Sequence, residues 1–97
     1  MEVEDFAKYV IDNISRASLS NALNITDRVL KEYNSLDFCN AILNECYKYS
    51  GGLEAKVLVG ICKACYDFKK QLKLEKVNEK MILDNLIVNI WEASNGH

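Results

Sequence analysis

Apolar residues recur every three or four positions along almost the whole chain, which is the spacing of one face of an α-helix. In the first segment, for example, Phe6, Val10 and Ile14 share one face. The pattern predicts amphipathic helices over residues 2–17 and about 20–33. Serines at positions 18 and 20 could cap the second helix, because a serine hydroxyl accepts a hydrogen bond from the first helical turn.

A third predicted helix begins at a cap on Ser35 or Asp37 and stops at Gly51-Gly52, since glycine readily adopts the left-handed conformation that ends a helix. A fourth helix then begins near Leu53. The side chains that we expect to face inward from the third helix are Phe38, Ala41, Ile42, Cys46 and Tyr47.

The predicted fourth helix carries apolar side chains on more than one side. A helix that is apolar nearly all round is either central in its bundle or covered by a partner. Gly60 lies in the middle of this helix, where glycine costs ~1 kcal/mol relative to alanine. We therefore expect another helix to cross closely at Gly60.

No proline or glycine interrupts residues 61–95, yet the phase of the apolar pattern shifts within this stretch. We place a helix break near residues 74–77, with Asn78 as the cap of a fifth helix that ends at Asn95-Gly96. One continuous helix of about forty residues is the alternative; it would reduce the fold to a four-helix bundle and would be long for a globular domain.

Composition supports an all-α fold. The 97 residues are 49% hydrophobic and 27% charged, with no proline and four glycines, so tight turns between short strands are hard to build. A chain of this length holds one core. We expect a single helical domain over residues 1–97, folded as a compact antiparallel bundle of about five helices.

The formal net charge is −2, with 12 basic and 14 acidic residues, which argues against binding to a nucleic-acid backbone. Lysines nevertheless gather in the C-terminal half. The candidate partner-binding residues are Tyr66 and the lysines Lys63, Lys69, Lys70, Lys73, Lys76 and Lys80. The lysine cluster over 63–80 could bind an acidic partner or, as an alternative function, nucleic acid; it could also simply complement the negative end of a helix.

Four cysteines are the only residues with distinctive chemistry. If the third and fourth helices pack as an antiparallel hairpin, Cys39 faces Cys62 and Cys65, and Cys46 faces about residue 57. The separation along the helix disfavours a zinc site with four thiolates. The trio could form a soft-metal or redox site, or Cys39 could be bridged to one of the other two. We expect instead four buried thiols, with no metal and no cofactor.

Two stretches resemble known families. The size, the charge asymmetry and the late break at Lys73-Leu74-Glu75-Lys76-Val77-Asn78-Glu79 look like the bacteriocin immunity proteins, which are small antiparallel bundles. The stretch Phe38-Cys39-Asn40-Ala41-Ile42-Leu43-Asn44, running through Gly51-Gly52 to Leu53-Glu54-Ala55, is similar to one pentatricopeptide-type helix pair. Neither resemblance assigns the chain to a family.

The sequence offers neither a glycine-rich phosphate loop nor an internal histidine, so we do not expect an enzyme. No apolar run is long enough for a membrane span, and the first residues are acidic where a signal peptide is basic; we expect a cytoplasmic protein. The function we predict is a helical protein–protein interaction module: an inhibitor, immunity or regulatory protein of cellular or viral origin. It would present a helix face to another protein or to its own copy, as a homodimer.

Overall fold

The computed structural model describes residues 1–48, 53–74, 76 and 78–95. Over these residues the fold is all-α, as predicted, with no strand. The elements are α1 (Val3–Asn13), a 3-10 turn η1 (Ile14–Arg16), α2 (Leu19–Glu32), α3 (Ser35–Lys48), α4 (Ala55–Leu72) and α5 (Glu79–Ser94). The predicted first helix is thus shorter than expected, because residues 14–16 tighten into the 3-10 turn. The glycines at 51, 52 and 96, which we expected to end helices, lie outside the described residues.

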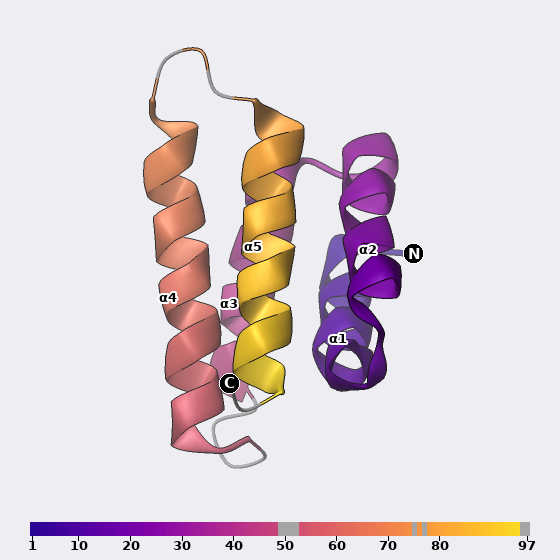
Figure 1. Ribbon diagram of the computed structural model, residues 1–97, viewed down its shortest axis with the longest axis vertical. Coiled ribbons are helices and arrows are strands. Elements are labelled where there is room, and N and C mark those ends of the chain that lie inside the picture. Colours follow the sequence, from indigo (N-terminus) through magenta and orange to yellow (C-terminus); the bar gives the residue numbers. More distant parts are fainter. Residues whose placement is uncertain (49–52, 75, 77, 96–97) are drawn as a thin grey trace.

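Helices α2 to α5 follow one another in alternating direction along the long axis of the molecule (Figure 1). The particle measures 37 × 24 × 24 Å. Helix α5 lies in the middle of the view, with α4 on one side and α1 and α2 on the other, and it packs against both α4 and α2. Helix α4 therefore forms an edge of the bundle, so of the two positions that its apolar composition allowed, central or covered by a partner, the central one is not observed.

Two of the expected helix caps are confirmed. The Ser18 hydroxyl accepts a hydrogen bond from the Asn21 N–H at 3.2 Å, and the Asn78 side-chain oxygen accepts one from the Met81 N–H at 3.1 Å. Each bond satisfies an N–H group that has no partner within the helix. These caps fix the first residues of α2 and α5.

The predicted cap of the third helix is wrong. Asn34, not Ser35 or Asp37, caps α3: its side-chain oxygen accepts a hydrogen bond from the Asp37 N–H at 3.0 Å. The Ser35 hydroxyl instead donates to the Glu79 carboxylate and joins the starts of α3 and α5. Serine and asparagine both suit a cap, so the sequence alone could not rank two neighbouring candidates.

The predicted break after the fourth helix is confirmed, and the alternative of one long helix is wrong. Helix α4 ends at Leu72, and α5 begins at Glu79. In the connection Lys76 adopts a positive φ of 58°, a left-handed conformation that reverses the chain without glycine or proline. The close crossing expected at Gly60 is also confirmed, because Gly60 packs directly on Ala93 of α5.

The buried apolar side chains form one cluster to which every helix contributes. Its largest fully buried members include Phe6, Phe38 and Phe68. The Trp91 indole N–H donates a hydrogen bond to the Ala17 carbonyl at 2.9 Å, which joins α5 to the connection between α1 and α2. Among the described helices, none combines the length and the apolar character that a membrane crossing requires.

Candidate functional site

A groove with apolar walls runs between α3 and α4. Its volume is about 580 Å³, and its lining residues are Cys46, Tyr47, Leu58, Val59, Cys62 and Tyr66. We call it the α3–α4 groove. No charged side chain contributes to this lining, so the groove offers apolar, aromatic and thiol surface to whatever fills it.

The groove exists because α4 is apolar on two sides. One side carries the buried residues Ile61, Ala64, Cys65 and Phe68, and it faces the core. The other side carries the groove residues of α4, of which Val59 is 67% exposed. Since α4 lies at the edge of the bundle, no helix of the described chain covers this second side. The second set of apolar residues, which the sequence already indicated in this helix, therefore lies at the surface.

Tyr47 and Tyr66 join the two walls of the groove. Their hydroxyl oxygens lie 3.3 Å apart, with Tyr47 on α3 and Tyr66 on α4. This hydrogen bond raises the pKa of Tyr47, because it favours the neutral phenol. Tyr47 was expected to face inward, yet it is 64% exposed. It lies next to Cys46, and one step of the helix is enough to turn a side chain from the core to its margin.

The six lysines of the predicted cluster have different surroundings. Lys69 lies over the Tyr66 ring, with its Nζ 6.0 Å from the ring centroid, so it adjoins the α3–α4 groove. Lys63 lines a different hollow, together with Asp67 and Glu92. The spacing along α4 therefore divides the charges between two sides of the helix.

The remaining lysines lie at the end of α4, in the connection and at the start of α5. Lys70 and Lys73 are exposed near the C-terminal end of α4, where positive charge is favourable. Lys76 lines a hollow at the connection between α4 and α5. Lys80 forms an ion pair with Asp84 at 3.0 Å, and that hydrogen bond raises the pKa of Lys80.

The four cysteines form two pairs along the contact between α3 and α4, and all four are free thiols. Cys39 lies beside Cys65, as expected, with its Sγ donating a hydrogen bond to the Cys65 carbonyl at 3.5 Å. The side-chain contact between the two thiols lowers the pKa of Cys39, and the same contact together with burial raises the pKa of Cys65. Both side chains are completely buried.

The second pair corrects the predicted register. Cys46 lies beside Cys62, not beside residue 57: burial, followed by the Cys62 thiol, raises the pKa of Cys46 to about 12. Val57 lines a different hollow. The side of α4 that faces α3 carries positions 58, 62 and 65, which repeat at intervals of four and three. Among the described residues, no group of three or more His, Cys, Asp or Glu side chains is placed to hold a metal ion.

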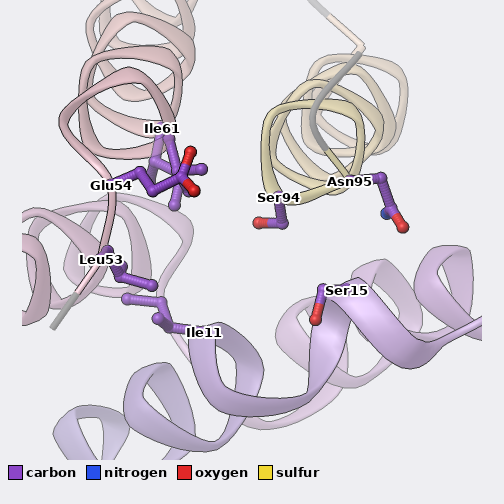
Figure 2. Close-up of a pocket in the computed structure, with 8 residues that line it drawn as sticks. Ile11, Ser15, Leu53, Glu54, Ile61, Ser94 and Asn95 are labelled. Atoms are coloured by element: carbon purple, nitrogen blue, oxygen red, sulfur yellow. The ribbon is translucent and has the colours of Figure 1, made fainter.

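A second hollow of about 430 Å³ lies where α1, α4 and α5 meet (Figure 2). Ser15, Ser94 and Asn95 bring polar groups to one side, and Glu54 faces them from the start of α4. The residues that precede Leu53 and follow Asn95 lie outside the described part of the chain. We assign this hollow no role.

Comparisons with known proteins identify no relative. The chain matches no protein-family model, and comparisons with curated proteins and with solved structures found no significant similarity. The arguments below therefore rest on the chemistry of the α3–α4 groove alone.

Proposed function

We propose that this protein is a small protein-interaction module whose α3–α4 groove receives an amphipathic helix of a partner protein. The observation that carries the proposal is the second apolar side of α4, which lies at the edge of the bundle and stays open to solvent. Val59, Tyr47 and Tyr66 are 67%, 64% and 49% exposed. Grouped apolar and aromatic side chains of this kind are typical of the places where proteins bind one another.

The chemistry of the groove favours a helix as the occupant. Helix-in-groove recognition uses an apolar stripe of the partner, which fills a hydrophobic channel between two helices. Tyrosine suits such a channel, since its ring buries apolar area and its hydroxyl keeps a polar contact. Here Tyr47 and Tyr66 already share a hydrogen bond across the channel.

Charge favours an acidic partner. Lys69 adjoins the groove through the Tyr66 ring, and Lys70 is exposed on the next position of α4. Acidic side chains that flank the apolar stripe of the partner would face these two ammonium groups. Complementary charges at the rim of an interface speed association and select among partners.

A module of this kind would act as an inhibitor, an immunity factor or a regulatory protein by occupying a partner's surface. The four free thiols support an intracellular setting, since cytosolic thiols are kept reduced. The partner would then be an intracellular protein.

A labelled model peptide tests the proposal. We would titrate the protein with a fluorescein-labelled amphipathic peptide that has leucine at every third and fourth position and glutamate along the flanks. We expect saturable binding, with NMR shift changes confined to residues around the α3–α4 groove. Val59→Asp should weaken binding at least about tenfold, because the peptide would bury an unpaired carboxylate. Met81→Asp is the matched control, since Met81 is similarly exposed at 57% but lies on α5.

A second pair of peptides tests whether the groove prefers an acidic partner. A peptide with lysine in place of each glutamate should bind more weakly, and K69E/K70E should reverse that preference. Equal effects of Val59→Asp and Met81→Asp would contradict the groove as the binding site. A homodimer in analytical ultracentrifugation that Val59→Asp dissociates would contradict the acidic partner and would identify a second copy as the occupant.

A further inference from the structure

Two tyrosine hydroxyls bring a pair of polar groups to the otherwise apolar α3–α4 groove. The hydroxyl oxygens of Tyr47 and Tyr66 lie 3.3 Å apart, one on each wall of the groove. Both side chains are well exposed, so a ligand in the groove can reach the pair from solvent. Among the lining residues, only these two carry a side-chain oxygen, and the others offer apolar or thiol surface.

Two phenol hydroxyls this close together can donate to one shared acceptor. A tyrosine hydroxyl both donates and accepts, so only one of the two protons is used within the pair. The hydrogen bond with Tyr66 raises the pKa of Tyr47, and this hydroxyl therefore keeps its proton at neutral pH. A carboxylate has two oxygens that only accept, and it can receive one proton from each hydroxyl. Hydrogen bonds to a charged acceptor are roughly twice as strong as those between neutral groups.

A positive charge adjoins the tyrosine pair. The Lys69 Nζ lies 6.0 Å from the centroid of the Tyr66 ring. Since no carboxylate belongs to the lining of the groove, an anion bound at the pair would meet the attraction of Lys69 without a like charge beside it. Two donors and a nearby ammonium group therefore favour an anionic acceptor over a neutral one.

We propose that the hydroxyls of Tyr47 and Tyr66 bind one glutamate carboxylate of the partner helix, which accepts a hydrogen bond from each hydroxyl while Lys69 balances its charge. We call this the carboxylate site. It rests on the proposed function, because the glutamate belongs to the helix that fills the α3–α4 groove. It adds a specificity-determining contact inside the groove to the acidic residues expected along the rim.

The spacing of the groove residues along α4 predicts where this glutamate stands in the partner. Val59, the exposed aliphatic residue of the lining, precedes Tyr66 by seven positions. Seven residues of an α-helix make two turns and span about 10 Å, and side chains at this interval share one face. A partner helix that runs along α4 therefore carries its glutamate seven positions from the leucine that covers Val59.

Matched peptides test the carboxylate site separately from groove binding as such. The first peptide has a leucine stripe with glutamate seven positions to either side of the central leucine, so that both orientations are served. In the second, glutamine replaces these two residues. In the third, the two glutamates move to the opposite face, so the net charge is unchanged. We expect the first to bind at least about fivefold more tightly than either of the others, because only its carboxylate reaches both hydroxyls.

Tyrosine-to-phenylalanine variants identify the groups that make the difference. Tyr47→Phe and Tyr66→Phe each remove one hydroxyl and keep the ring. Each should reduce the preference for the first peptide, and the double variant should abolish it. Affinity for the glutamine peptide should stay within about twofold, since that peptide binds through apolar contacts. Tyr9→Phe is the matched control, because Tyr9 is 51% exposed but lies on α1, outside the groove.

The outcomes separate this inference from the proposed function. Equal affinity for the glutamate and glutamine peptides, or a preference that survives the double variant, would overturn the carboxylate site and leave groove binding intact. Equal affinity for the first and third peptides would assign the effect to general charge attraction and would also refute the site. If none of the three peptides binds saturably, the proposed function fails, and the carboxylate site fails with it.

Discussion

Gly60 on α4 and Ala93 on α5 meet so closely that a methyl group added to Gly60 would lie 2.7 Å from the Ala93 Cβ. Real side-chain carbons do not approach to that distance, so one of the two helices would have to shift. Glycine lowers helix propensity by ~1 kcal/mol, and the close crossing explains why this helix carries it in its interior.

We expect Gly60→Ala to lower the free energy of unfolding by about 1–2 kcal/mol, because the clash outweighs the gain in helix propensity. The measurement is urea denaturation followed by circular dichroism. Ala93→Gly in the same chain should recover part of the loss, since it removes the methyl group that the new one meets. Additive losses in the double variant would show that the contact at Ala93 is not the cause.

The Ser18 cap gives a second prediction. Ser18→Ala should destabilise the protein by about 1 kcal/mol, because the Asn21 N–H loses its partner. Ser20 is the matched control: it is exposed in the first turn of α2, and the sequence made it an equal candidate for the cap. Ser20→Ala should change stability by less than about 0.5 kcal/mol. Equal losses in the two variants would argue against a specific role of Ser18.

The hydrogen bond from Trp91 to Ala17 gives a third prediction. Trp91→Phe keeps an aromatic ring but removes the indole N–H, so the Ala17 carbonyl loses its donor. We expect a loss of about 1 kcal/mol or more, since the substitution also reduces the ring volume. Amide hydrogen exchange should quicken around residues 14–18 and at the end of α5. Faster exchange spread evenly over the whole chain would instead indicate a general packing defect.

The raised pKa of Cys46 predicts how stability depends on pH. Burial, followed by the Cys62 thiol, raises the pKa of Cys46 from 9.0 to about 12 in the folded protein. Its contribution is therefore fully present below pH 9 and is lost as the pH rises toward 12, because the unfolded state releases its proton first. Between pH 9 and pH 10 we expect a loss of about 1 kcal/mol from this group.

Comparison with Cys46→Ser isolates that contribution. In the presence of a reductant, urea denaturation at pH 8, 9 and 10 should give a steeper decline for the unaltered protein than for the variant, since serine does not titrate in this range. Parallel declines would show that other groups cause the alkaline loss.

Helical spacing and capping chemistry predicted most of the fold. The break before Asn78 and the crossing at Gly60 could be derived because each is marked by a local feature, a phase shift of the apolar pattern and a glycine inside a helix; that Ala93 is the residue that meets Gly60 could not be derived. The position of α4 in the bundle could not be derived from the sequence, because a helix that is apolar on two sides fits the centre of a bundle and its edge equally well. Only the packing of α5 between α4 and α2 decides between the two positions.

The candidate site shows the same limit. Tyr66 and Lys69 were candidates from the sequence, and they do adjoin the α3–α4 groove, but Tyr47 was assigned to the core. The pairing of Cys46 with Cys62 was missed for a related reason. Counting outward from the turn of a helical hairpin pairs residues by their distance along the two helices, but it does not say which side of each helix faces the other. Positions 58, 62 and 65 of α4, read as one stripe, would have indicated it.

The order in which these helices meet also has a kinetic consequence. The α4–α5 hairpin joins neighbouring segments through a short connection, whereas the contact between α2 and α5 must close a loop of at least 46 residues, 33–78. We expect the hairpin to form early and the N-terminal helices to dock onto α5 late. Trp91 is the only tryptophan of the chain, and its indole sits where that docking takes place. Its intrinsic fluorescence is thus a built-in reporter of the final folding step.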